Sequence, residues 1–175
     1  MIPHYQNIHN QFKINGFHFD KEALFQLAYS LIKEGKEHEH DLGVFLLDWL
    51  DEKETIQLTT SGTTGAPKNI TIKKQSMVGS AIATGNFFDL HPKDKALLCL
   101  PAKYIAGKMM IVRAMILGFD LDIMVPTSHL DDLLPHKKYD FVAIVPLQAE
   151  NSFEKLHQFK KIIIGGAKVS DHLAF

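Results

Sequence analysis

Apolar residues recur at helical spacing in the first fifty residues of the chain. Over residues 21–34 they form one stripe, which predicts an amphipathic helix that Asp20 can cap and Gly35 can end. A charged connector over residues 36–41 then leads into a second, shorter helix. The apolar residues of this second helix are Val44, Phe45, Leu47 and Trp49. We therefore expect residues 1–54 to form an N-terminal helical region.

Downstream of this region, short apolar runs alternate with helical segments. The runs predict strands over residues 55–59, 69–73, 96–100, 121–125, 140–145 and 162–164. The spacing of apolar residues predicts helices over residues 75–88, 105–117 and 147–157. Continuous apolar strands separated by helices indicate a mostly parallel sheet covered on both faces. The predicted fold class is α/β, with helices flanking the sheet.

A stretch rich in hydroxyl groups and glycine, LTTSGTTGAPK, joins the first two of these strands and ends at Lys68. Such a composition also suits a flexible linker, but a strand on either side favours a loop held between two fixed ends. Backbone N–H groups of a glycine-containing turn can converge on phosphate oxygens, and hydroxyl groups add further donors. A lysine supplies the positive charge that a polyphosphate needs. The loop is therefore a candidate phosphate site.

The loop differs from the P-loop of NTPases, G-x-x-x-x-G-K-[ST] followed by a helix. Gly62 and Lys68 have the required separation, but Pro67 replaces the second glycine and Asn69 replaces the Ser/Thr. A strand, and not a helix, is predicted to follow. The residues and their context therefore disfavour a kinase or an NTPase, which would need an atypical phosphate loop.

The composition limits the classes of partner and compartment. With 46% hydrophobic and 22% charged residues the chain can bury a sizeable core, and its net charge of −1 gives no reason to expect nucleic acid as a partner. Its single cysteine, Cys99, lies in an apolar run, so we expect a buried, inert thiol and a reducing compartment. The sequence contains no secretory signal pattern and no apolar run near the ~20 residues of a membrane span. We expect a cytoplasmic protein without membrane insertion.

Four segments, in order along the chain, resemble landmarks of the adenylate-forming superfamily of acyl-CoA synthetases, luciferases and peptide-synthetase adenylation domains. Thr60–Lys68 resembles the phosphate signature T-S-G-[ST]-T-G-x-P-K at every fixed position. Leu100–Gly107 is similar to L-P-x-x-H-x-x-G, with Tyr104 where a histidine is usual. Residues 141–146 match a strand that ends in Val-Pro, and residues 162–167 resemble the strand and Gly-Gly-Ala turn that line the adenine pocket.

This resemblance implies part of the N-terminal domain of an enzyme that joins a small carboxylic acid to coenzyme A, using ATP and Mg²⁺ through an acyl-AMP intermediate. It implies catalytic roles for Lys68 and Thr64. The residues implied to bind the phosphates of ATP are Thr60, Ser61, Gly62, Thr63, Thr64, Gly65 and Lys68. The backbone of Gly165, Gly166 and Ala167 is implied to lie against the base. The glutamate that usually holds Mg²⁺ belongs to a motif not found in this sequence, so no metal ligand is assigned.

Within the superfamily, residues 104–110 and the short N-terminal region look like the o-succinylbenzoate–CoA ligases of menaquinone biosynthesis. That substrate carries a second carboxylate, for which Lys108 and Arg113 are candidate partners, with Tyr104 as a candidate wall of the acyl pocket. Each of these residues also has a plain structural interpretation: a cation that extends to solvent, or a core tyrosine. Five residues apart, Lys108 and Arg113 lie about 140° apart around a helix and cannot share a narrow stripe.

The sequence lacks the aromatic-G-x-T-E and T-G-D motifs and the C-terminal domain of similar enzymes. Thr84-Gly85-Asn86 lies in a predicted helix and is not the T-G-D element. We therefore expect residues 55–175 to be the nucleotide-binding α/β portion of a longer ligase, with a non-catalytic nucleotide-binding module as the alternative. Residues 37–40, Glu-His-Glu-His, are interpreted as a solvated loop and not as a metal site. The oligomeric state is not predicted.

Overall fold

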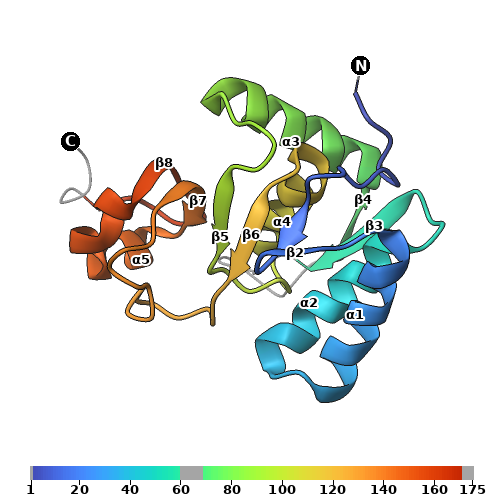
Figure 1. Ribbon diagram of the computed structural model, residues 1–175, viewed down its shortest axis with the longest axis horizontal. Helices are drawn as coiled ribbons and strands as arrows, with labels where there is room; N and C mark the ends of the chain where they lie inside the picture. The colour runs from blue at the N-terminus through green and yellow to red at the C-terminus, as the bar shows by residue number, and fades with distance from the viewer. Residues whose placement is uncertain (1, 60–68, 171–175) are drawn as a thin grey trace.

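The computed structural model describes residues 2–59 and 69–170 of the chain. Six strands form one sheet in the order β2-β1-β6-β5-β7-β8 (Figure 1). These strands are β1 (Lys13–Ile14), β2 (Phe17–His18), β5 (Lys95–Leu98), β6 (Asp120–Ile123), β7 (Tyr139–Ile144) and β8 (Phe159–Ile164). Every neighbouring pair is parallel except β1 with β2. The predicted α/β class with a mostly parallel sheet is confirmed.

Helices surround this sheet, and most of them begin and end near the predicted residues. They are α1 (Lys21–Glu34), α2 (Glu37–Leu50), α3 (Lys74–Phe88), α4 (Ile105–Leu117), α5 (Pro146–Asn151) and the 3₁₀ helix η1 (Phe153–Gln158). Asp20 caps α1 as predicted, since its Oδ1 accepts a hydrogen bond of 2.9 Å from the backbone N–H of Ala23. Among the described residues, no helix has the length and apolar character needed to cross a bilayer.

Apolar side chains alternate between the two faces of the sheet, so each face has its own core. The core of one face draws side chains from α1 to α4, and its sheet members include Ala96, Leu98, Leu121, Phe141 and Ala143. The core of the other face includes Ala149 of α5, together with Leu97, Cys99, Val142 and Ile144 of the sheet region. Helix α4 therefore lies on one face and α5 on the other.

A separate antiparallel hairpin consists of β3 (Thr55–Thr59) and β4 (Asn69–Lys73). The two strands pair from Thr55 opposite Lys73 to Thr59 opposite Asn69, and Thr59 Oγ1 also donates to Asn69 Oδ1 over 3.0 Å. Both predicted strands are thus confirmed. Because they pair up to residues 59 and 69, the two described residues that flank the predicted phosphate motif lie opposite each other in one hairpin.

An ion pair with one buried partner lies at the base of this hairpin. The side chain of Lys74 is fully buried, and its Nζ lies 2.6 Å from Asp51 Oδ1 and 5.4 Å from the centre of the Tyr5 ring. Its backbone N–H donates to the carbonyl of Glu54 over 2.8 Å. These contacts tie the end of α2 to the start of α3, the helix that follows β4.

The structure corrects several predicted boundaries. Residues 36–41 do not form a connector, because α2 begins at Glu37, where Glu39 Oε2 accepts a 2.7 Å hydrogen bond from the backbone N–H of Lys36. The predicted helix over residues 147–157 is two short segments, α5 and η1. Strand β8 begins three residues before the predicted start, and neither β1 nor β2 was predicted.

Candidate functional site

The path of the chain changes direction between two neighbouring strands at the centre of the sheet. From β5 the chain crosses one face through α4 to reach β6, whereas from β7 it crosses the other face through α5 and η1 to reach β8. Since β5 and β7 are neighbours, their outgoing connections diverge. Ligands of open α/β sheets bind in the crevice outside the carboxyl ends of such strands. The segments that follow β5, β7 and β8 are therefore the candidate site.

The segment after β5 approaches the first turn of α4 very closely. A Cβ atom added to Gly107 would lie 2.2 Å from the carbonyl oxygen of Pro101, so only glycine fits at this position. Tyr104 directly precedes the helix, is 42% exposed, and lies with its ring centre 5.3 Å from Lys103 Nζ. The L-P-x-x-H-x-x-G resemblance thus has a steric cause, and Tyr104 lies at the candidate edge with part of its ring open to solvent.

The segments after β7 and β8 lie beside each other. Gly165 donates its backbone N–H to the carbonyl of Ile144 over 3.2 Å, and a Cβ atom added to Gly166 would lie 3.6 Å from Val145 Cγ1. Gly166 has a φ of +85°, a conformation that favours glycine. A Cβ atom added to Gly165 would meet no described atom within 4 Å. The Gly-Gly-Ala turn, which includes the exposed Ala167, is thus open at the carboxyl end of β8.

Sequence reasoning missed one residue that links these segments. Gln148 is buried on α5, and its Nε2 donates to the carbonyls of Cys99 (3.0 Å) and Thr127 (2.8 Å). Its Oε1 accepts a 3.2 Å hydrogen bond from the backbone N–H of Val145. Its contact with Val145 is local, but no sequence pattern marks its contacts with Cys99 and Thr127, which only the fold brings together.

Lys108 and Arg113 both extend from α4 but contact different neighbours, as the predicted angle of about 140° requires. Lys108 is buried, with Nζ 2.7 Å from the carbonyl oxygen of Ala102 and 5.0 Å from the centre of the Phe45 ring. Burial lowers the pKa of Lys108, and nearby carboxylates of α2 oppose that shift. The plain structural interpretation, a cation that extends into solvent, is therefore wrong for both residues.

Arg113 points toward α3 and the sheet. Its Nε donates to Thr84 Oγ1 over 3.3 Å, and its guanidinium carbon lies 5.9 Å from the centre of the Phe141 ring. Burial lowers the pKa of Arg113. Of the two candidate substrate cations, Lys108 is the one whose ammonium group reaches the segment that follows β5.

The seven residues that the resemblance assigns to phosphate lie in the range 60–68, outside the described residues. The structure places only the two strand ends that flank them. Cys99 lies at the end of β5 and is fully buried, with Sγ 3.8 Å from the carbonyl oxygen of Ala143. Burial raises the pKa of this thiol to about 12, as expected for an inert cysteine.

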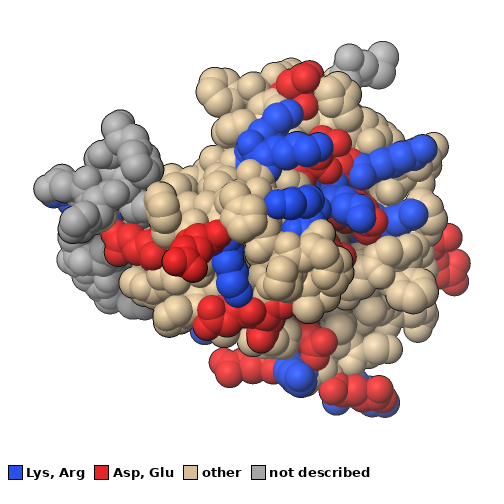
Figure 2. All heavy atoms as spheres, turned by 60° about the vertical axis from the view of Figure 1, so that its left-hand side comes forward, with Lys and Arg blue, Asp and Glu red and all other residues tan. Residues whose placement is uncertain are grey.

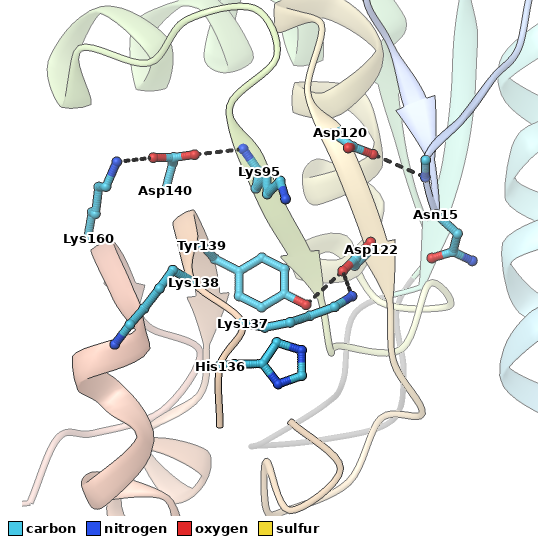
Figure 3. A pocket seen from close by; sticks show the side chains of 11 residues that line it. Asn15, Lys95, Asp120, Asp122, His136, Lys137, Lys138, Tyr139, Asp140 and Lys160 are labelled. Atoms are coloured by element: carbon cyan, nitrogen blue, oxygen red, sulfur yellow. Dashed lines mark hydrogen bonds and ion pairs between the residues drawn. The ribbon is translucent and has the colours of Figure 1, made fainter. Parts of the chain in front are cut away.

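A polar cavity of about 620 Å³ lies at the opposite edge of the sheet, by the amino ends of its strands (Figure 3). Its carboxylates already have partners: Asp140 contacts Lys160 Nζ over 2.6 Å, and Asp122 accepts hydrogen bonds from Lys137 and Tyr139. Burial acts to raise the pKa of Asp140, but hydrogen bonds from Lys160 and the Lys95 backbone hold it below its usual range. On the face shown in Figure 2, basic and acidic side chains are likewise intermixed.

A smaller cavity of about 250 Å³ lies by the carboxyl ends of β5 and β6, between the first turn of α2 and the segments after the two strands. His38 of the Glu-His-Glu-His stretch lines it, together with Pro101 and Lys103. This stretch is the first turn of a helix and not the loop that was expected. Within residues 2–59 and 69–170, no group of three or more His, Cys, Asp and Glu residues is suited to hold a metal ion.

Comparison with solved structures shows the same architecture in acyl-CoA synthetases. An acyl-CoA synthetase (AMP-forming)/AMP-acid ligase II-like protein from Dyadobacter fermentans is 35% identical, with a TM-score of 0.72 over 85% of this chain and 44% of that protein. The N-terminal domain of FACL13 from Mycobacterium tuberculosis is 22% identical, with a TM-score of 0.57 over 73% of this chain and 38% of that domain.

The o-succinylbenzoate CoA synthetase of Bacillus subtilis, solved with its acyl-adenylate intermediate, is also 22% identical, with a TM-score of 0.57 over 64% of this chain and 31% of that protein. At this identity the likeness is one of fold alone. The chain thus spans less than half the length of each of these structures. A comparison with curated proteins gave no match.

A sequence model of the family described as "AMP-binding enzyme" matches residues 30–174, which is most of the chain. The match includes the hairpin, the segment after β5 and the Gly-Gly-Ala turn. Together with the 35% identical Dyadobacter structure, it extends the agreement from fold to sequence. The chain belongs to the AMP-binding family of adenylate-forming enzymes and has the fold of part of their N-terminal domain.

Proposed function

We propose that this chain contributes the ATP-binding part of an acid–CoA ligase. The observation that carries the proposal is the motif over residues 60–68, whose two ends are fixed by the paired strands β3 and β4. The open Gly-Gly-Ala turn at the carboxyl edge supports it, because Gly165 leaves room for a planar group to approach the backbone. In this arrangement Lys68 and Thr64 act on the terminal phosphates, and the backbone of Gly165, Gly166 and Ala167 contacts adenine.

The proposed reaction has two steps. A carboxylate oxygen of the acid attacks the α-phosphorus of ATP, the bond between the α- and β-phosphates breaks, and pyrophosphate leaves. The thiolate of coenzyme A then attacks the acyl carbon, and AMP leaves with the electron pair of the acyl–oxygen bond. The first step brings two anions together, so donors and a lysine at the phosphates lower its barrier. Mg²⁺ would add charge at the phosphates, but the described residues present no ligand set for it.

We infer that o-succinylbenzoate is the acid. Support comes from the segment over residues 104–110, which resembles ligases of that substrate, and from the positions of its candidate contacts. Tyr104 lies exposed beside α4, and Lys108 Nζ reaches the carbonyl of Ala102 just before it. Arg113 extends instead toward Thr84 of α3. Lys108 is therefore the better placed partner for the second carboxylate.

Product analysis tests the reaction class. We would assay the 175-residue chain, alone and extended by the C-terminal half of the family's catalytic unit, with ATP, coenzyme A and o-succinylbenzoate. Acid-dependent release of AMP and pyrophosphate by the extended form is expected, with little turnover by the chain alone. Release of ADP would contradict the ligase and support a kinase, and nucleotide binding without any turnover would support a non-catalytic module.

A matched pair of acids tests the substrate. In the extended form, kcat/KM for o-succinylbenzoate should exceed that for an analogue without the second carboxylate by about 10²-fold or more, because a buried polar group left unpaired is costly. Lys108→Met should remove this preference, whereas Arg113→Met should keep it. Equal use of the two acids by the unaltered protein would contradict o-succinylbenzoate as the substrate.

A further inference from the structure

Gln148 connects three segments that come from different parts of the chain. Its partners Cys99, Thr127 and Val145 follow β5, β6 and β7, respectively. Both hydrogens of the amide nitrogen are used, and the amide oxygen accepts the third hydrogen bond. One side chain thus sets the spacing of the three strand ends that border the candidate crevice.

The contact with Val145 extends this influence to the Gly-Gly-Ala turn. The side chain of Val145 is the nearest described group to a Cβ atom at Gly166, at 3.6 Å, and its neighbour Ile144 accepts the N–H of Gly165. A shift of Val145 would therefore move the backbone against which the base is proposed to lie. Cys99, on the other side, directly precedes the Leu100–Gly107 segment.

A second glutamine has the same chemistry at a different place. Gln158 is also buried, and its Nε2 donates to the carbonyls of Leu134 (2.8 Å) and Lys137 (2.7 Å). These carbonyls belong to the approach to β7, at the amino edge of the sheet. Of these two buried glutamines, Gln148 borders the carboxyl edge of the sheet and Gln158 the amino edge.

We propose that Gln148 is a positioning residue for nucleotide binding. It holds the ends of β5 and β7 at the separation that lets ATP contact both the segment after β5 and the Gly-Gly-Ala turn. This inference rests on the proposed function, since it takes ATP to bind at this edge. A hydrophobic side chain of similar length would fill the volume but remove the hydrogen-bond partner that Gln148 gives to two carbonyls and one N–H, of which the Cys99 carbonyl belongs to a fully buried residue.

Gln148→Met and Gln158→Met form a matched pair that separates positioning from general stability. Gln148→Met loses three hydrogen bonds and Gln158→Met loses two, so both variants should lower the thermal midpoint, Gln148→Met by somewhat more. In the 175-residue chain, hydrogen exchange should speed up by about tenfold or more at the Val145 amide in Gln148→Met only, because that N–H loses its acceptor.

Equilibrium binding of ATP to the extended form gives the decisive readout. We expect the dissociation constant to rise about tenfold in Gln148→Met and to change less than about twofold in Gln158→Met. If the unaltered protein binds ATP and both variants bind it equally well, or if Val145 exchange is unchanged, the role of Gln148 is overturned and the proposed function stands. If the unaltered protein binds no ATP, the proposed function fails and this role fails with it.

Discussion

The two edges of the sheet are built from different chemistry. The amino edge carries lysine and aspartate side chains that pair with one another, as at Lys160 with Asp140 (Figure 3). The carboxyl edge is bordered by glycine and proline backbone, with Gln148 buried beneath it. The amino edge has the larger cavity and more charge, but its carboxylates are already paired. At the carboxyl edge, a Cβ atom added to Gly165 would meet no described atom within 4 Å, and the outgoing connections of β5 and β7 diverge there.

The largest expected effect separates a lysine of the phosphate motif from one of the amino edge. In the extended form, Lys68→Ala should lower kcat by about 10²–10³-fold, because a group that stabilises transferring phosphate is lost. Lys95→Ala, at the rim of the polar cavity, should change kcat by less than about twofold. The measurements are steady-state kinetics and thermal unfolding. A large loss of stability in Lys68→Ala with normal kcat would contradict this difference.

Glycine substitutions test how tightly the carboxyl edge is packed. Gly107→Ala should lower the free energy of unfolding by about 3 kcal/mol, since its Cβ would overlap the Pro101 carbonyl and force a backbone shift. Gly79→Ala, in α3 with no described atom within 4 Å of the added Cβ, should raise it by up to about 1 kcal/mol. Urea denaturation measures both. Equal effects of the two substitutions would refute the close approach of α4 to the segment after β5.

Ion pairs at the hairpin base and at the amino edge should differ in strength. Asp51→Asn leaves the fully buried ammonium of Lys74 without a counter-charge, which should cost about 2–3 kcal/mol because part of Asp51 is open to solvent. Asp140→Asn removes the partner of the well-exposed Lys160 and should cost less than about 1 kcal/mol. Denaturant unfolding near pH 7 compares them. A larger loss of unfolding free energy in Asp140→Asn than in Asp51→Asn would contradict the expectation that the pair at the hairpin base is the stronger one.

The same carboxylates predict the acid limit of stability. Burial acts to raise the pKa of Asp51, but hydrogen bonds from Lys74 and the Lys53 backbone hold it below the ordinary value of 3.8. The pKa of Asp51 is lower in the folded chain than in the unfolded chain, so its ionised carboxylate stabilises the fold. This stabilisation is complete at pH values above the pKa of the unfolded chain and is lost as the pH falls through the pKa of the folded chain. Unfolding free energy should therefore fall as the pH drops from about 5 to 2. Asp51→Asn should flatten that dependence more than Asp140→Asn does.

The smallest expected effect concerns the thiol at the end of β5. With its pKa raised to about 12, Cys99 should react with a thiol reagent at pH 8 only after the chain unfolds. Labelling with iodoacetamide in native and denaturing buffer, followed by mass spectrometry, checks this. Rapid modification of the folded chain would mean that the carboxyl end of β5 is open.

Much of the fold could be predicted because its signals are local. The α1 stripe, its Asp20 cap and the strands of the hairpin depend on residues a few positions apart. Strands β1 and β2 were missed because each has only two residues, which is too few to show an alternating pattern. The pairing of β1 with β6 joins residues more than a hundred positions apart, which no local signal reveals. The start of β8 was missed because Lys160 and Lys161 interrupt its apolar run.

The residues of the candidate site likewise divide into those with a local sequence signal and those without one. The glycines at 107, 165 and 166 could be selected as candidates because their motifs are contiguous in the sequence, and the structure supplies a steric reason for the first. The start of α2 could have been found from Glu39, whose side chain caps the Lys36 backbone three residues earlier. The contact of Gln148 with Val145 is local in the same way, but its contacts with Cys99 and Thr127 could not have been found, because these residues lie far from it in the chain. Only the folded sheet brings those carbonyls to one amide.

Photolabelling with 8-azido-ATP tests the central claim, that the nucleotide binds at the carboxyl edge, most directly. The extended form would be irradiated with the probe, with and without excess ATP, and its labelled peptides identified by mass spectrometry. ATP-protected labelling of the peptide that contains Gly165, Gly166 and Ala167 is the predicted result. ATP-protected labelling confined to peptides of the amino edge, which carry Lys95, Tyr139 or Lys160, would contradict it.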